Sequence, residues 1–359
     1  MSIGLVGSLS GSLAPNDVPI EQGVQAWVAY INSHGGLAGR QVVLHTADDG
    51  GSPTTFDELT QQMVKSDHVV AFVGDAGAGT VQGGASYLQQ AGVPVIGGAN
   101  ENTVYDTNPD FYDLYTNLAS TDADTLSAVA KFAPSDTKLG VIVCAGIEAC
   151  TTVPDHWKQV AQKTGQTLVY TATAPLTTVD FTTNCLAAKN AGVQALGMYE
   201  PLQAEIALGK DCATENYHPI LIGDTSAVSS ALPAQGGSAV DGLMDITQSV
   251  PPWTQGAALA PLRSYLHQAP AQVNSQAVLG WTAGKAFEAA GQFFPKTGTI
   301  TSADVVAGLH KLNGSTLGGL VPPLVIGQPG QPNPGSSCYF AVQIKNSQWV
   351  TLNGGTYVC

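Results

Sequence analysis

Apolar and polar positions follow two different periodicities over the first fifty residues, one typical of strands and one typical of a helix. Residues 3–7 are a short apolar run that ends in glycine, and a loop of small residues follows it. Residues 20–33 carry apolar side chains at helical spacing, and residues 41–49 form a second strand-like run that ends in two aspartates. A strand, a loop, an amphipathic helix and a strand in this order predict a βαβ unit. We expect its sheet to be parallel and covered by helices, with ligands meeting the loops beyond the strand ends.

The same alternation continues along the chain. Apolar runs typical of buried parallel strands recur at 69–74, 93–98, 138–143 and 193–199, and helical patterns lie between them. A chain of 359 residues is long enough for about two domains, each with its own core. The pattern therefore predicts an α/β protein with more than one sheet.

The residue order near the N-terminus resembles a known family. Residues 9–11 read Leu-Ser-Gly, residues 31–40 read Ile-Asn-Ser-His-Gly-Gly-Leu-Ala-Gly-Arg, and residues 48–49 read Asp-Asp. This string is similar to the start of the type I periplasmic binding proteins, the branched-chain amino-acid receptor group of ABC importers (leucine/isoleucine/valine-binding protein-like). The resemblance covers essentially the whole chain and is strongest before residue 120.

That resemblance implies two Rossmann-like lobes with parallel sheets flanked by helices, joined by a hinge that the chain crosses three times. Residues 1–118 plus 250–325 would form lobe one, and 119–249 plus 326–359 would form lobe two. The implied protein is an extracytoplasmic receptor for a small polar solute, such as an amino acid or a related amine, amide or aromatic compound. It would capture the solute in the cleft between the lobes and deliver it to the membrane subunits of an ABC permease, as a monomer without cofactor, metal or catalysis.

The family's ligand-binding positions can be carried over one by one. In lobe one they fall on Asn16, Ala78, Gly79, Thr80, Ala99, Asn100 and Glu101, and in lobe two on Ile147, Glu148, Tyr199, Glu200, Asp224 and Thr225. The hydroxyls that grip an amino-acid carboxylate in the family are lost at Ala78 and Glu101. The carboxylate that pairs with an α-amino group is Thr225 here, next to Asp224. These departures argue against a simple branched-chain amino acid.

The acids among these positions have two interpretations. Glu101 and Glu200 are either site residues or exposed loop charges, and Asp224 is either a site residue or a helix cap. If two of the three line the cleft, a cationic, amine-bearing or hydroxyl-rich ligand is favoured over an anion. Tyr199 would then stack on the ligand.

The loop that follows residue 75 offers backbone donors. Unpaired N–H groups at Ala78, Gly79 and Thr80 should point out of the strand end toward a polar ligand, at the start of a helix over 81–91. The alternative is that Gly77 and Gly79 only permit a tight turn.

Composition limits the class of partner and the compartment. The net charge of −14 argues against nucleic acid, which needs clustered Lys and Arg, and its simplest role is solubility. No stretch approaches the roughly 20 apolar residues of a membrane helix. Met1 stands two residues before the first strand, so we expect a mature chain without its export signal, from a periplasmic or cell-surface and possibly lipid-anchored protein.

Six cysteines point to an oxidising compartment. They allow 15 pairings, but they cluster as near neighbours, which favours three local disulfides. The pairs we expect are Cys144–Cys150, Cys185–Cys212 and Cys338–Cys359. The alternative is six buried free thiols in a cytosolic protein.

Two further functions remain open at this point. A ligand sensor of the same fold would have the same lobes without a transport role. An NAD-dependent enzyme is suggested by Gly77-Ala-Gly-Thr-Val-Gln-Gly, although this string is one residue too long for the Gly-x-Gly-x-x-Gly motif. The catalytic motifs of hydrolases, metalloproteases and phosphate loops are absent from the sequence.

Overall fold

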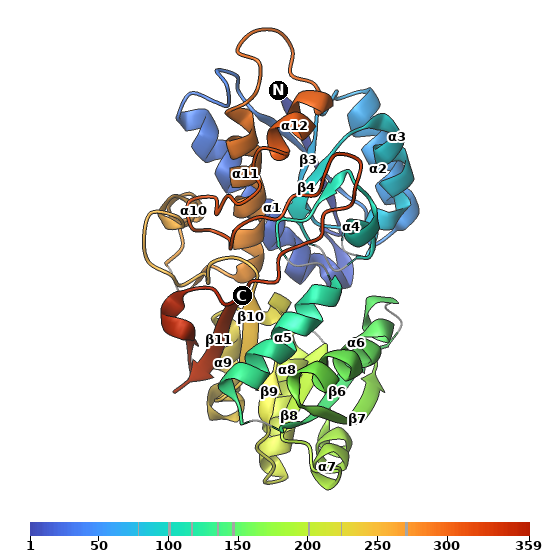
Figure 1. Cartoon of the computed structure of the whole chain (residues 1–359), viewed down its shortest axis with the longest axis vertical. Helices are drawn as coiled ribbons and strands as arrows, with labels where there is room; N and C mark the ends of the chain where they lie inside the picture. The colour runs from blue at the N-terminus through green and yellow to red at the C-terminus, as the bar shows by residue number, and fades with distance from the viewer. Residues whose placement is uncertain are drawn as a thin grey trace. The chain divides into compact units, whose positions relative to one another are not determined.

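The chain folds into two compact units in a computed structural model. The structure describes residues 1–77, 79–99, 102–115, 118–134, 136–145, 148–199, 202–223, 225–269 and 272–359, with the backbone alone at 118–120, 148, 149 and 226. Unit 1 comprises Met1–Leu118 and Gln248–Ser336, and unit 2 comprises Ala119–Thr247 and Ser337–Cys359 (Figure 1). The chain therefore passes from one unit to the other three times.

Unit 1 is built on a five-stranded parallel sheet in the order β2-β1-β3-β4-β5. The strands are β1 (Ser2–Gly7), β2 (Val43–Asp48), β3 (Phe72–Asp75), β4 (Val95–Gly98) and β5 (Phe111–Tyr112). The helices of this unit are α1 (Ala14–Ser33), α2 (Pro53–Lys65), α3 (Ala85–Ala91), α4 (Val104–Thr107), α10 (Ala260–Leu266), α11 (Ser275–Gly291) and α12 (Ser302–Leu309).

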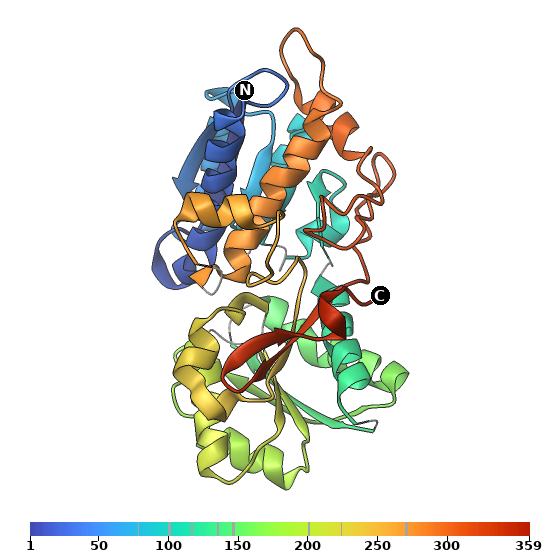
Figure 2. The same cartoon turned by 90° about the vertical axis from the view of Figure 1, so that its left-hand side faces the viewer.

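Two helices from distant parts of the sequence, α1 and α11, lie side by side in unit 1 (Figures 1 and 2). Glycine permits this close approach, because a side-chain carbon on Gly23 would collide with the carbonyl oxygen of Ala277, and one on Gly280 with that of Ile20. Trp281 of α11 is buried in this unit. Helix α1 begins at Ala14, before the region in which the apolar spacing predicted it.

Unit 2 contains a seven-stranded sheet in the order β12-β11-β10-β9-β8-β6-β7. Its strands are β6 (Lys138–Cys144), β7 (Thr167–Ala174), β8 (Ala195–Tyr199), β9 (Ile220–Ile222), β10 (Met244–Thr247), β11 (Phe340–Lys345) and β12 (Gln348–Thr351). Its helices are α5 (Leu118–Phe132), α6 (Glu148–Thr164), α7 (Thr182–Asn190), α8 (Leu202–Thr214) and α9 (Ala231–Gly236). Strands β7-β6-β8-β9-β10 are parallel and repeat the order of unit 1, and β11 and β12 add an antiparallel hairpin.

The tail of the chain differs from the sequence-based assignment. Residues 326–336 were assigned to lobe two, but they lie in unit 1. Two hydrogen bonds hold them there: Asn333 Nδ2 donates to the carbonyl of Phe111 at 2.8 Å, and the N–H of Ser336 donates to the carbonyl of Tyr115 at 2.8 Å. The third crossing therefore comes after Ser336, eleven residues later than expected.

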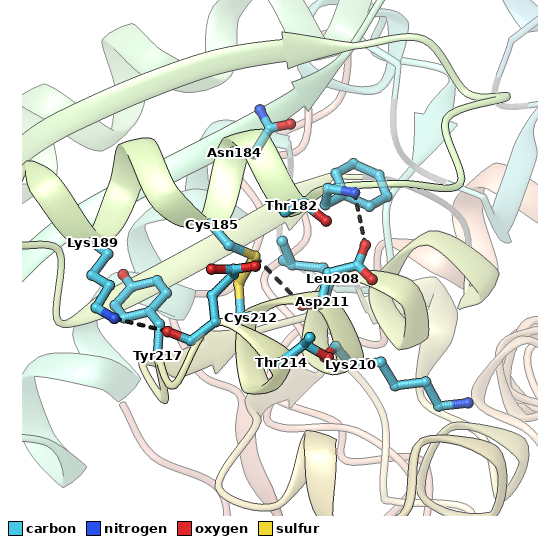
Figure 3. Close-up of a disulfide and its surroundings, with 12 residues drawn as sticks. Thr182, Asn184, Cys185, Lys189, Leu208, Lys210, Asp211, Cys212, Thr214 and Tyr217 are labelled. Atoms are coloured by element: carbon cyan, nitrogen blue, oxygen red, sulfur yellow. Dashed lines mark hydrogen bonds between the residues drawn. A yellow bond between two sulfur atoms is a disulfide. The ribbon is translucent and has the colours of Figure 1, made fainter.

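All three predicted disulfides are confirmed: Cys144–Cys150, Cys185–Cys212 and Cys338–Cys359. Figure 3 shows the buried Cys185–Cys212 bond, which joins α7 to α8. A second link lies beside it, because Asp211 of α8 accepts the N–H of Phe181, which precedes α7, at 2.7 Å. These bonds fix two helices on the sheet of unit 2.

Removing the Cys185–Cys212 bond should destabilise unit 2. The bond joins residues 27 apart, and closing a loop of that size stabilises the folded state by about 3–4 kcal/mol. We expect a Cys185→Ala/Cys212→Ala variant to lose free energy of unfolding of that order, measured by urea denaturation without reductant. An unchanged unfolding midpoint in the variant would contradict this account.

Candidate functional site

The parallel strands of unit 1 all end at one edge of its sheet, and the loops that follow them begin there. Strand β1 lies between β2 and β3. The chain connects β1 to β2 on one side of it and then crosses over to β3 on the other side, so the strand order reverses at β1. Open α/β sheets bind ligands at such a switch point, in the crevice outside the strand ends. The loops after β1, β2 and β3 are therefore the expected ligand-binding region of this unit.

Asp49 ties these three loops together. Its Oδ1 accepts the hydroxyl of Ser8 at 2.8 Å and the N–H of Gly51 at 2.7 Å. Its Oδ2 accepts the hydroxyl of Thr80 at 2.6 Å. The N–H of Ser8 in turn donates to Asp17 Oδ2 at 3.1 Å, which links α1 to the same cluster. Hydrogen bonds to an ionised carboxylate are the stronger kind, so this cluster fixes the strand ends.

Thr80 and the loop before it differ from the sequence-based expectation. The N–H of Thr80 is not unpaired, because it donates to the carbonyl of Gly77 at 2.8 Å. The loop leads first into a 3-10 turn at Val81–Gly83, and α3 starts only at Ala85. The N–H of Thr80 is therefore not unpaired as expected, and the helix expected over 81–91 begins at Ala85.

Asp75, the last residue of β3, was not singled out by the sequence. Its side chain is fully buried, and neither carboxyl oxygen accepts a hydrogen bond of normal geometry from any residue that the structure describes. Burial raises the pKa of Asp75 well above its ordinary value, and the negative charges of Asp49 and Asp17 raise it further. The available signal was an acid directly after an apolar strand, in Phe-Val-Gly-Asp.

In unit 2 the candidate residue Tyr199 ends strand β8, next to the switch point between β6 and β8. Its hydroxyl donates to Asp122 Oδ1 of α5 and accepts the indole N–H of Trp157 at 3.1 Å. The second oxygen of Asp122 lies 2.7 Å from Nδ1 of His156. Sequence reasoning did not single out Asp122, so its buried role was missed.

The remaining candidates are placed unevenly. Asn16 lies in the first turn of α1, and Gly79 is exposed in the loop after β3. Ala99 is buried, and its N–H donates to the carbonyl of Asp75 at 2.9 Å. Thr225 starts a short 3-10 turn after β9. Six candidates lie outside the described residues, namely Ala78, Asn100, Glu101, Ile147, Glu200 and Asp224, and Glu148 is described by its backbone alone, as the first residue of α6.

The described part of the chain has neither a metal-binding cluster nor a membrane-spanning helix. Within it, no group of three or more His, Cys, Asp or Glu side chains is arranged to hold a metal ion. None of the helices described is both long and apolar enough to span a bilayer.

Comparison with known proteins places these features in a family context. The family model described as "Periplasmic binding protein" matches residues 1–348. A Leu/Ile/Val-binding protein, BraC3 of Rhizobium johnstonii, is 31% identical over 96 residues. That match covers 27% of this chain and about a quarter (26%) of the relative's length.

Solved structures share the fold at low sequence identity. A branched-chain amino-acid ABC transporter protein from Thermus thermophilus with bound valine has a TM-score of 0.82 at 15% identity, over 98% of this chain and 96% of that one. A solute-binding protein from R. palustris in complex with benzoate has a TM-score of 0.76 at 18% identity, over 98% and 95% of the two chains. At these identities the likeness establishes the fold and leaves the ligand open.

The buried acid of unit 1 should make stability depend on pH. The folded state holds the proton of Asp75 more tightly than the unfolded chain does. The contribution of Asp75 to the free energy of unfolding is therefore full below about pH 4, and it is lost as pH rises through the raised pKa. The free energy of unfolding should fall by up to about 1.4 kcal/mol per pH unit in that window. We expect Asp75→Asn to show a shallower fall as pH rises above about 4 in urea denaturation.

The matched control for this measurement is Glu58→Gln, which neutralises an exposed acid on α2. It should keep the wild-type dependence on pH. Equal slopes in Asp75→Asn and the wild type would show that Asp75 does not hold the proton.

Proposed function

Because the chain belongs to the periplasmic binding protein family, we propose that it is an extracytoplasmic receptor that captures a small polar solute for an ABC permease. The observation that carries this proposal is the repeated strand order. Both units use the order of a doubly wound sheet, and both have buried, hydrogen-bonded side chains at the strand ends beside the switch point. Rigid side chains in such a place suit recognition of a small molecule.

The class of solute follows from what the described residues offer. Thr80 donates its hydroxyl to Asp49, and Tyr199 donates its hydroxyl to Asp122. Neither proton is therefore offered to a solute carboxylate in this arrangement. This supports a solute with an apolar, aromatic or amine-bearing part over one recognised by its carboxylate alone. The valine and benzoate complexes of the two structural neighbours make both amino acids and aromatic acids reasonable first probes.

We propose binding without catalysis. The alternative of an NAD-dependent enzyme loses support because the glycine string ends in a 3-10 turn at Val81–Gly83, and the helix that follows has only seven residues. A dinucleotide fingerprint instead places its glycines directly at the start of a longer helix that receives the pyrophosphate.

Thermal unfolding with a ligand panel tests this proposal. The panel contains L-valine, L-glutamine, spermidine, benzylamine, benzoate, glucose and NAD. A ligand at 100 times its dissociation constant should raise the free energy of unfolding by about 2.7 kcal/mol, which is a shift of a few degrees in Tm. We expect at least one small solute to give such a shift and NAD to give none.

Two results would count against the receptor. A shift with NAD alone would favour the enzyme, and a shift with no compound would remove the proposed ligand classes. Isothermal titration calorimetry on the compound with the largest shift then gives its dissociation constant and a stoichiometry, which should be one per chain.

A further inference from the structure

Four side chains from three elements of unit 2 form a continuous chain of hydrogen bonds, which we name the Tyr199 network. It runs from His156 to Asp122, from Asp122 to Tyr199, and from Tyr199 to Trp157. Asp122 lies on α5, Tyr199 ends β8, and His156 and Trp157 are neighbours on α6. The network thus joins the end of β8 to two helices.

The hydrogen-bonding groups of this network are largely committed to one another. A phenol has one proton to donate, and Tyr199 gives it to Asp122. The indole N–H of Trp157 can only donate, and it uses a lone pair of the same hydroxyl at 3.1 Å. Each oxygen of Asp122 has a partner, one in Tyr199 and the other in His156. The polar end of Tyr199 therefore faces the protein.

Burial makes this arrangement difficult to rearrange. The Asp122 side chain is 0% exposed, and a buried carboxylate that loses its partners is strongly destabilising. The ring of Trp157 is fully buried and meets the Tyr199 ring edge to face, with centroids 6.2 Å apart and planes at 74°. Packing and hydrogen bonds together allow Tyr199 one orientation, while its side chain stays partly exposed.

We infer that Asp122 and His156 are positioning residues, which hold Tyr199 so that its ring and not its hydroxyl is presented to the solute. The inference rests on the proposed function, since it concerns the same solute. A ring face attracts apolar, aromatic and cationic groups. Asp122 is far from Tyr199 in sequence but bonded to it and, because its carboxylate is buried and both oxygens have partners, it does not act as the partner of a solute amine.

A set of variants at Tyr199 separates ring from hydroxyl. We expect Tyr199→Leu to raise the Kd by about tenfold or more because the ring is lost, and Tyr199→Phe to raise it by less than about fivefold because the ring remains. Binding is measured by titration calorimetry with L-valine, benzylamine and benzoate. The matched control is Tyr170→Phe, which removes another hydroxyl of unit 2. That hydroxyl accepts a hydrogen bond from Asn184 Nδ2 at 3.3 Å and does not lie at the strand ends.

A double-mutant cycle tests whether Asp122 acts through Tyr199. Asp122→Ala should weaken binding in the Tyr199 background and have little further effect in the Tyr199→Leu background. Asp122→Asn should recover most of the loss, because an amide can accept from the phenol and donate to the imidazole. A merely structural role would give the same loss in both backgrounds, and a direct solute contact would leave Asp122→Asn as weak as Asp122→Ala.

The indole N–H resonance of Trp157 reports on the network without any ligand. It should move in Tyr199→Phe and Asp122→Ala and stay unmoved in Tyr170→Phe. An unmoved resonance in Tyr199→Phe would overturn the network, and wild-type affinity in Tyr199→Leu would overturn the ring contact. If no panel compound binds the wild type while the resonance moves as expected, the proposed function fails and the ring contact falls with it, whereas the hydrogen-bond network stands.

Discussion

The carboxylate of Asp49 is the interaction on which the strand ends of unit 1 depend. Three parallel strands end at one edge of the sheet, and each is followed by a loop whose polar groups need partners. Asp49 supplies acceptors to Ser8 after β1, to Gly51 after β2 and to Thr80 after β3. Asp48, one residue earlier, accepts the N–H groups of Leu9 and Gly50, both at 2.9 Å. Thus the Asp-Asp pair that carried the family resemblance organises the loops themselves.

Unit 2 repeats the strand order of unit 1, but different residues supply the hydrogen-bond partners at its strand ends. Its buried carboxylate comes from α5, a helix that precedes the first strand of this sheet, and it holds an aromatic side chain from a strand end. Disulfides add covalent support, since Cys144 ends β6 and Cys150 lies in the first turn of α6. Both units therefore place a buried acid, Asp49 or Asp122, beside the switch point, although the two units share no sequence motif that would predict it.

Much of the fold could be predicted from periodicity and local chemistry. Apolar runs gave β1, β3 and β6, and cysteines that are close in sequence gave the disulfides. The start of α1 was hidden because residues 14–19 contain Pro15 and Pro19 and little apolar spacing, although proline fits the first turn of a helix. Residues 326–336 were misassigned because single side-chain bonds such as Asn333 to Phe111 leave no pattern in the sequence.

The candidate site shows where sequence reasoning stops. Sequence reasoning identified Thr80, through its backbone N–H, and Tyr199, through the family resemblance, as positions near a ligand, but it could not show to which partner each hydroxyl donates. That partner depends on Asp49 and Asp122, which lie 31 and 77 residues away from them in sequence. A hydroxyl has one proton, so a residue type that grips a ligand in one relative can brace the protein in another. In this chain the hydroxyls of Thr80 and Tyr199 both donate to carboxylates of their own units, which is why we propose recognition by the ring of Tyr199.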